Sequence, residues 1–509
     1  MIRERIEQAI QEALPGVAFV VERPRALQHG DYSTNAALVS KTDPQELADK
    51  LHIEGVEKVE VVGKFINFRL AREALVPKEQ QIPQLYAGKK IMVEYTDPNP
   101  FKEFHIGHLV GNVIGESLAR LFEATGATVS RANYQGDVGV HVAKAIWGKM
   151  QKPEASWGDS YTFGDSQYEA HKEEIDTLNK TIYEKSDAAV NKLYDEGRAQ
   201  SLEHFEEIYK TLGTKFVYYF FESETGPKGV EIVRKHPGVF EESDGAVVFK
   251  GEPYGLHTRV FINSKGLPTY EAKELGLAEA KQQKGSFDLS ITITAHEISE
   301  YFKVVRKAAE LVFPNLEGRM LARFHGFLRL TTGKMSSRKG NVITGESLIE
   351  DLTEAARGRQ DVAVGAIKYT LLKSGITKDI IFDPEKSLSL EGDSGPYLQY
   401  ALVRARALLR KAKEAGIKAG ESDSPKEASA LERVLMHYAD AVARAAKEME
   451  PHYVTTYLTE LAAAFNSWYA QEKVIGGPHQ EYGVFLTQAV ERTLAQGLHL
   501  LGIPSPEEM

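Results

Sequence analysis

Residues 93–108, VEYTDPNPFKEFHIGH, constrain the fold more than any other stretch of the chain. The apolar run at 91–93 leads into turn residues, which is typical of a short buried strand. Two prolines at 97–100 break regular structure, because each restricts its own backbone and that of the residue before it. Apolar residues then recur at helical spacing over 110–122, and 128–132 has the composition of another strand. The order strand, turn, helix, strand predicts a parallel βαβ unit.

The start of the expected helix has the chemistry of a phosphate site. A helix N-terminus carries partial positive charge and free N–H groups, which favour an anion. Gly107 has no Cβ, so a nucleotide could approach the backbone closely there. His105 and His108 supply donors on either side of it. Four-residue patterns of this kind also arise by chance, and the flanking strand and helix give this one its weight.

Composition excludes several classes of protein. The chain has 509 residues, enough for about three domains, and a net charge of −10 that argues against a sequence-independent nucleic-acid coat. It contains no cysteine, so we expect neither disulfides nor a zinc site built on thiolates. No apolar run approaches the roughly 20 residues of a membrane span, and the N-terminus is an amphipathic helix with no signal-peptide pattern. We expect a cytoplasmic protein.

Three domains are expected along the chain. Residues 1–80 alternate helix and strand patterns and should form a small α/β domain. Residues 81–385 should form a parallel α/β domain, with 151–250 inserted between its two halves. From 386 to 509 the pattern is helical throughout, which predicts an all-α domain.

The signature stretch resembles that of class I aminoacyl-tRNA synthetases, most closely the arginyl-tRNA synthetases. The similarity extends over the whole chain, and it implies a Rossmann-like parallel sheet, an N-terminal α/β domain and a C-terminal helical anticodon-binding bundle. The residues that carry the match are Glu94, Pro98, Asn99, Lys102, His105, Gly107 and His108, followed by the stretch RANYQGD at 131–137.

The resemblance implies an arginine site made of acidic and polar side chains. Glu94 and Glu274 would hold the guanidinium with Tyr270 beside them, and Asn99 would lie nearer the α-amino group. Tyr270 and Glu274 are four residues apart, so they share a face of the predicted helix. The family usually has Asp at the second position, so the longer Glu274 leaves its reach open. A solvated helix face is the alternative for this pair.

A later basic stretch resembles the second signature of the class, and a mobile basic loop without this role is the alternative. Residues 331–341 read TTGKMSSRKGN, and Lys334, Met335, Ser336, Ser337 and Arg338 would contact ATP or neutralise pyrophosphate as it leaves. Ser337 stands where the family usually has lysine, and Lys102 would compensate. His105, Gly107 and His108 complete the expected phosphate contacts. His296 and Glu297 follow an expected buried strand, so they are candidates for the adenosine site.

Two regions would contact tRNA if the resemblance holds. Residues 65–70 alternate with period 2, which also fits a half-buried edge strand. Residues 401–413 carry five basic side chains and no acidic one, which also fits a solvated helix face. The candidates for tRNA contact are Asn67, Phe68, Arg69, Tyr397, Gln399, Arg406 and Arg410.

The implied reaction is ligation of L-arginine to tRNA(Arg), with ATP as its Mg²⁺ complex and arginyl adenylate as the intermediate. We expect a monomer with no zinc and no membrane partner. Rival interpretations are a lysyl or glutamyl enzyme of the same class, a nucleotidyltransferase acting on a small molecule, and a non-catalytic tRNA-binding scaffold. A panel of amino-acid substrates distinguishes the first of these from an arginyl enzyme. Turnover without tRNA would favour the nucleotidyltransferase, and failure to bind ATP would favour the scaffold.

Overall fold

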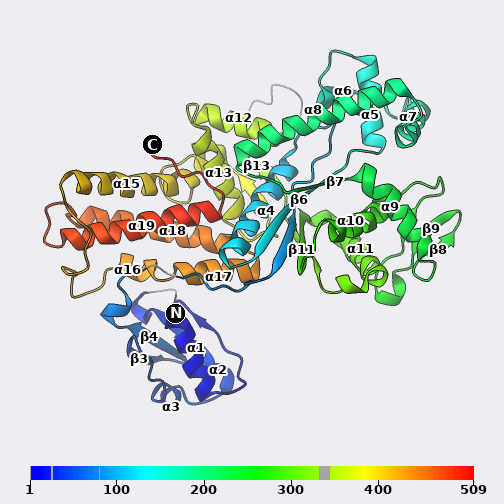
Figure 1. The fold of residues 1–509 in the computed structure, drawn as a ribbon. Helices are drawn as coiled ribbons and strands as arrows, with labels where there is room; N and C mark the ends of the chain where they lie inside the picture. The colour runs from blue at the N-terminus through cyan, green and yellow to red at the C-terminus, as the bar shows by residue number, and fades with distance from the viewer. Residues whose placement is uncertain (1, 25–26, 79–80, 332–343) are drawn as a thin grey trace.

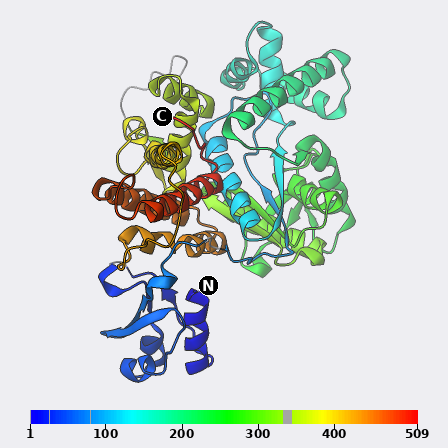
Figure 2. The same ribbon diagram turned by 60° about the vertical axis from the view of Figure 1, so that its left-hand side comes forward.

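A computed structural model describes residues 2–24, 27–78, 81–331 and 344–509 of the chain. Figure 1 shows a small N-terminal module set apart from the rest, a central sheet with helices on both faces, and a layer of C-terminal helices against it. Rotation by 60° keeps this separation (Figure 2). Within the described residues, no helix is both long and apolar enough to cross a bilayer.

The N-terminal module is an antiparallel sheet in the order β1-β2-β4-β3 with short helices packed on it. Helix α1 buries Ile6 and Ile10 against this sheet, as its amphipathic pattern predicts. Strand β1 is short, because only Val21 and Glu22 pair with β2. The elements are α1 (Ile2–Ala13), β1 (Val21–Glu22), β2 (Tyr32–Thr34), α2 (Ala36–Ser40), α3 (Pro44–Ala48), β3 (Val56–Val62) and β4 (Phe65–Leu70).

The central sheet is parallel and runs in the order β12-β11-β5-β6-β7. From β5 the chain moves outward to β6 and β7, and the later strands β11 and β12 add on the other side. Strand order therefore reverses between β5 and β11, where open α/β sheets form a crevice at the carboxyl ends of their strands. The strands are β5 (Lys90–Glu94), β6 (Thr128–Gln135), β7 (Tyr218–Phe221), β11 (Leu289–Ala295) and β12 (Met320–His325).

Different helices cover the two faces of this sheet (Figure 1). Ile91 and Val93 of β5 belong to the core that includes α4, whereas Met92 packs among residues of α10 and α11. Since side chains alternate along a strand, Glu94 lies on the α10 face with Met92. A small antiparallel sheet borders this second core. The elements are α4 (Ile106–Ala124), α9 (Glu222–Lys235), β8 (Glu241–Ser243), β9 (Ala246–Phe249), β10 (Arg259–Ile262), α10 (Tyr270–Lys284) and α11 (Ser299–Val312).

Four helices occupy the connection between β6 and β7. They are α5 (Val140–Gln151), α6 (Trp157–Gln167), α7 (Lys172–Glu184) and α8 (Ala188–Leu212). The expected insertion at 151–250 is thus wrong in its second part, because β7 returns to the central sheet and pairs with β6. Asp137 links the inserted helices to α9: its buried carboxylate accepts hydrogen bonds from Arg198 Nε (2.9 Å) and Ser223 N (2.8 Å).

The C-terminal helices share one apolar core with α4 and the sheet. The contact is also polar: Ser117 Oγ of α4 donates to the carbonyl of Leu500 at 3.0 Å. The remaining elements are β13 (Leu328–Leu330), α12 (Gly345–Ala355), α13 (Gln360–Leu372), β14 (Ile380–Phe382), α14 (Pro384–Ser387), α15 (Gly395–Glu414), α16 (Ala430–Leu435), α17 (Tyr438–Glu448), α18 (His452–Gln471) and α19 (Gln480–Leu500).

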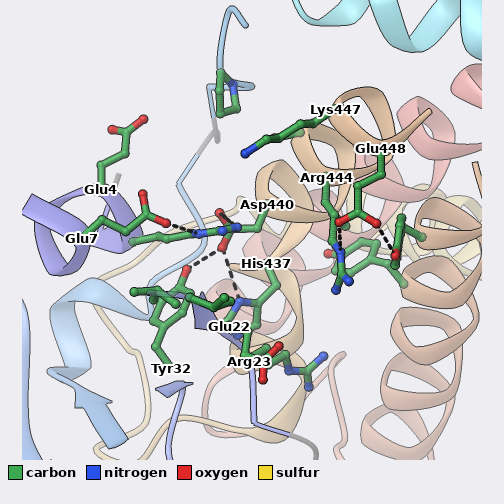
Figure 3. A pocket seen from close by; sticks show the side chains of 18 of the residues that line it. Glu4, Glu7, Glu22, Arg23, Tyr32, His437, Asp440, Arg444, Lys447 and Glu448 are labelled. Carbon is green, nitrogen blue, oxygen red and sulfur yellow. Dashed lines mark hydrogen bonds and ion pairs between the residues drawn. The ribbon is translucent and has the colours of Figure 1, made fainter. Parts of the chain in front are cut away.

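Ion pairs and hydrogen bonds join the N-terminal module to the C-terminal helices. A cavity of about 760 Å³ lies at this junction, where α1 and β1 face α17 and α18; Figure 3 shows side chains that line it. Asp440 of α17 accepts a hydrogen bond from Tyr32 Oη (2.7 Å) and lies 3.6 Å from Arg3 Nη1. Charged contacts of this kind fix the position of the module on the helices.

Candidate active site

The turn after β5 has a strained backbone. Thr96 (φ 80°), Asp97 (φ 45°) and Phe101 (φ 69°) all have left-handed backbone conformations, which side-chain-bearing residues adopt at a cost. Packing maintains them: Phe101 is fully buried, and its backbone N–H donates to Ser201 Oγ at 2.9 Å. Strain of this kind concentrates at functional sites.

His105 and His108 cap helix α4 with their side chains. Nδ1 of His105 accepts from the backbone N–H groups of Gly107 (3.1 Å) and His108 (3.4 Å), and Nδ1 of His108 accepts from His105 N (3.3 Å). The two rings stack with centroids 3.4 Å apart. Because each Nδ1 is an acceptor, a neutral ring must carry its proton on Nε2, which is then a donor.

Both histidines are held neutral near pH 7. Burial and the charge of Lys102 lower the pKa of His105, and burial followed by the His105 and Lys102 charges puts the pKa of His108 well below its usual value. Gly107 has an added role beyond the expected one, because a Cβ there would lie 3.1 Å from Cε1 of the His105 ring. The missing side chain thus makes room for the capping histidine.

Lys102 lies beside the inserted helices. Its Nζ sits 4.4 Å from the ring centroid of Tyr161 on α6, a cation–π contact. Burial lowers its pKa, and the nearby Asp165 opposes that change. The expected role of Lys102 toward phosphate stays a prediction.

Glu94 is the buried centre of the crevice. Its side chain is 2% exposed at the end of β5, and Oε1 accepts from Thr292 Oγ1 on the neighbouring β11 at 3.0 Å. Oε2 lies 2.8 Å from Lys281 Nζ of α10, yet it receives no well-directed hydrogen bond from any residue in the described ranges. A buried carboxylate oxygen in this state still has a lone pair to offer.

Two more carboxylates converge on the same place. Burial, followed by the Glu94 charge, raises the pKa of Glu274 to about 8 and the pKa of Asp97 well above its usual value. Lys281 acts in the opposite direction on both groups. Three acids and one ammonium therefore share the crevice, an arrangement that favours a cationic ligand.

The other expected arginine-site residues lie at the rim. Tyr270 is 62% exposed at the start of α10, and Lys273 Nζ sits 5.0 Å from its ring centroid. Asn99 packs against Gly136, where a Cβ would lie 2.3 Å from Asn99 Oδ1. This close approach explains why glycine occupies that position.

His296 and Glu297 are exposed in the short 3₁₀ turn that follows β11, at the carboxyl edge of the sheet. Their proposed adenosine contacts stay a prediction. Lys334, Met335, Ser336, Ser337 and Arg338 lie outside the described residues.

The expected tRNA contacts need correction at several positions. Phe68 is fully buried in the core of the N-terminal module, and its neighbour Asn67, on the opposite face of β4, is only 3% exposed. Gln399 is also fully buried, and its amide donates to the carbonyls of Asp361 (3.0 Å) and Pro504 (2.9 Å). Side chains without accessible surface cannot contact an RNA directly, so the prediction of direct contact is wrong for these three.

The remaining candidates for tRNA contact differ in their exposure and in their contacts within the protein. Arg69 pairs with Glu60 at 3.0 Å, and Arg406 pairs with Glu491 at 3.0 Å and also contacts the C-terminal segment. Arg406 thus has a structural role that its basic pattern did not reveal. Tyr397 is half-buried and accepts from Asn466 Nδ2 (3.2 Å). Arg410 is exposed.

Sequence reasoning missed several crevice residues. Asp97 was interpreted only as part of a turn, and the positions of Lys281 and Thr292 follow from strand order and helix placement. Tyr134 and Tyr301 also border the acids, since burial and Glu274 contribute to raising the pKa of each. One signal was available for Lys281: it lies seven residues after Glu274, two helical turns along the same face.

Family models match the chain over nearly its whole length. The N-terminal residues 1–70 match the arginyl tRNA synthetase N-terminal domain, residues 71–384 match the catalytic domain of class I (R) tRNA synthetases, and residues 398–509 match the DALR anticodon binding domain. With the parallel sheet and the histidine-capped helix at its switch point, these matches define a class I aminoacyl-tRNA synthetase. The expected fold class is confirmed.

Comparison with similar proteins indicates which family of class I synthetases the chain resembles. The chain is 29% identical to the arginine–tRNA ligase of Clostridium acetobutylicum, with 100% of this chain and 99% of that one covered. The arginyl-tRNA synthetase of Thermus thermophilus superposes with a TM-score of 0.83 at 27% identity, covering 100% and 99%. That of Plasmodium falciparum shares the fold at a TM-score of 0.80 and 18% identity, covering 100% and 98%. The chain belongs to the arginyl-tRNA synthetase family.

Proposed function

We propose that the acidic crevice between β5 and β11 binds the arginine that this enzyme ligates to tRNA in an ATP-dependent reaction. The observation that carries the proposal is the convergence of Glu94, Asp97 and Glu274 beside a single ammonium. A guanidinium is a planar fork that pairs with carboxylates through two N–H groups, and it carries the charge that this crevice favours.

Discrimination follows from the same burial. A neutral or shorter amino acid would leave buried carboxylates without partners, and such a site can reject the wrong substrate by roughly 10⁴-fold. A glutamate substrate would add a fourth carboxylate to three existing ones. Lysine brings a charge without the bidentate geometry, so it is the closest competitor.

The first step joins arginine to ATP. A carboxylate oxygen of arginine attacks the α-phosphorus, the bond from that phosphorus to the bridging oxygen breaks, and pyrophosphate leaves with the electron pair. We assign the Nε2–H donors of His105 and His108 to the phosphates, with the N-terminus of α4 beside them. ATP enters as its Mg²⁺ complex. Lys102, Lys334 and Arg338 are proposed to offset charge on the leaving pyrophosphate.

The second step transfers the arginyl group. A hydroxyl of the terminal ribose of tRNA(Arg), taken as the 2′-hydroxyl for this class, attacks the arginyl carbonyl carbon. The carbon–oxygen bond to the phosphate breaks, AMP leaves with its electrons, and the hydroxyl proton is released. The enzyme contributes mainly by positioning the reactants and stabilising charge, as is usual for transfer at phosphorus.

We also propose that the protein is a cytoplasmic monomer. Light scattering measures the mass of the particle in solution and so tests the monomeric state.

Arginine-dependent exchange of pyrophosphate into ATP tests this function. The assay is run with and without tRNA(Arg), and with lysine and glutamate as alternative substrates. Exchange with arginine and a much weaker signal with lysine is the expected result. Exchange that is equal for arginine and lysine would contradict the assigned site, and no exchange with any amino acid, with or without tRNA, would favour the scaffold alternative.

A further inference from the structure

Lys281 is a buried lysine whose partners all belong to the arginine crevice. Its side chain is 2% exposed, and its Nζ lies 2.8 Å from Glu94 Oε2 and 3.3 Å from Ser290 Oγ. A buried ammonium needs nearby acceptors, and Glu94 Oε2 and Ser290 Oγ supply them.

Three separate elements converge to hold Glu94. Strands β5 and β11 pair in parallel with Glu94 beside Thr292, so Ser290 and Thr292 lie on the same face of the sheet as Glu94. Thr292 fixes Oε1 by a hydrogen bond, and Lys281 from the covering helix α10 stands over Oε2. This arrangement fixes both oxygens of Glu94 in position before any substrate arrives.

The geometry leaves part of Oε2 available. Lys281 lies within ion-pair distance of this oxygen, but its direction is poor for a hydrogen bond, and Oε2 receives none within the described part of the chain. An ionised carboxylate oxygen can accept two hydrogen bonds. A guanidinium N–H could therefore bind to Oε2 while Lys281 stays in place.

We propose that Lys281 is a positioning residue for arginine recognition: its ammonium holds the Glu94 carboxylate in orientation and leaves an Oε2 lone pair for the guanidinium. This inference rests on the proposed arginine site. Lys281 touches neither arginine nor ATP in this scheme, and it acts on the substrate through Glu94.

The charges around Lys281 make the role testable by pH. Burial and the Glu94 charge raise the pKa of Asp97 and of Glu274, while Lys281 opposes both changes. Without Lys281, protons should bind Asp97 and Glu274 more readily, and a higher pH would be needed to ionise these two acids for arginine. The titratable and charged groups that face this cluster are Glu94 and Asp97 at the end of β5, Glu271, Glu274 and Lys281 on α10, Glu222 on α9, Tyr134 on β6 and Tyr301 on α11.

The decisive variant is Lys281→Met, which keeps the length of the side chain and removes the charge. We expect KM for arginine to rise about 100-fold, the range expected when a buried carboxylate loses its charged partner, with kcat less affected. KM for ATP should stay within about twofold. The pH at which kcat/KM for arginine is half-maximal should move upward by about one unit, and Lys281→Arg should restore much of the loss.

Lys368→Met is the matched control. Lys368 is equally buried, at 1% exposure, but it lies on α13 and donates to the carbonyls of Leu212 and Gly502 (2.7 Å for Gly502). Its loss should lower the melting temperature without changing the ratio of the two KM values. If Lys281→Met gives the same pattern as Lys368→Met, Lys281 is only structural and the proposal is overturned.

Two further results separate the remaining outcomes. Tighter binding of arginine by Lys281→Met would mean that the lysine competes with the substrate, which also overturns the proposal. If that variant does not fold, Ser290→Ala carries the test, since it frees the ammonium and should raise KM for arginine about threefold to tenfold; an unchanged value contradicts the proposal. A wild-type enzyme without arginine-dependent exchange would instead refute the proposed function.

Discussion

At the scale of single residues, the environment of Glu274 decides its chemistry. An ordinary glutamate is ionised at pH 7, but burial and the neighbouring Glu94 raise the pKa of Glu274 to about 8. In most molecules of the substrate-free protein, Glu274 is therefore protonated near pH 7. A guanidinium pairs best with the ionised form, so arginine binding and deprotonation of Glu274 should be linked.

Arginine affinity should consequently rise with pH. Below a pKa of about 8, the ionised fraction of Glu274 grows about tenfold for each pH unit, so we expect the dissociation constant of arginine to fall about tenfold between pH 6 and pH 7. Isothermal titration in two buffers of different ionisation enthalpy should show about one proton released at pH 7. Glu274→Gln should reduce this slope. Affinity that does not change with pH would contradict the assignment.

At the scale of elements, helix α4 begins with a capping histidine to which we also assign a phosphate contact. The Nδ1 atom of His105 caps the helix, so the proton of its neutral ring is on Nε2, which is then a donor. Histidine is an unusual cap, since Ser, Thr, Asp and Asn are the preferred residues at this position. The cap therefore fixes the tautomer that a phosphate contact requires.

Two substitutions of His105 should separate stability from activity. His105→Ala removes both functions, and we expect it to lower the free energy of unfolding by about 1 kcal/mol and the exchange rate by about 100-fold. His105→Asn retains a good cap, so it should recover the stability while the rate stays low. Thermal denaturation and pyrophosphate exchange measure the two effects. Recovery of the rate by asparagine would show that capping alone accounts for the histidine.

At the scale of the whole molecule, buried acids fix the N-terminal module on the C-terminal helices. Asp31 is 1% exposed, and it pairs with Arg433 of α16 while its other oxygen accepts from Leu70 N at 2.9 Å. Arg72 similarly pairs with the buried Glu432 at 2.8 Å. Losing one partner of such a pair leaves a buried charge uncompensated, which is strongly destabilising.

Arg433→Met should therefore release the N-terminal module. We expect faster hydrogen exchange in β4 and α16, and faster proteolysis between residues 71 and 90, with little change in arginine-dependent exchange because the crevice lies elsewhere. Arg23→Met is the comparison: its partner Glu460 is 44% exposed, so that pair should contribute only about 0–1 kcal/mol. Equal effects of the two variants would show that burial of Asp31 does not govern the docking.

The sequence by itself determined the βαβ unit around residues 93–108 and the helix that starts at His105. These features are local, since turn residues, caps and side-chain periodicity act over a few positions. The similarity of the signature residues also identified the family. The sequence did not predict which side chains of residues 65–70 are buried, because a period of two predicts a strand but not which face meets the core.

Only the tertiary structure decided which residues share the crevice. Glu94, Asp97, Glu274, Lys281 and Thr292 span about 200 positions, and they meet because β11 returns beside β5 and α10 covers that face. The same applies to Gln399 and Arg406, whose partners come from the C-terminal segment about 100 residues away. Charge and hydrogen bonding depend on distance in space, and the order of strands in the sheet sets that distance.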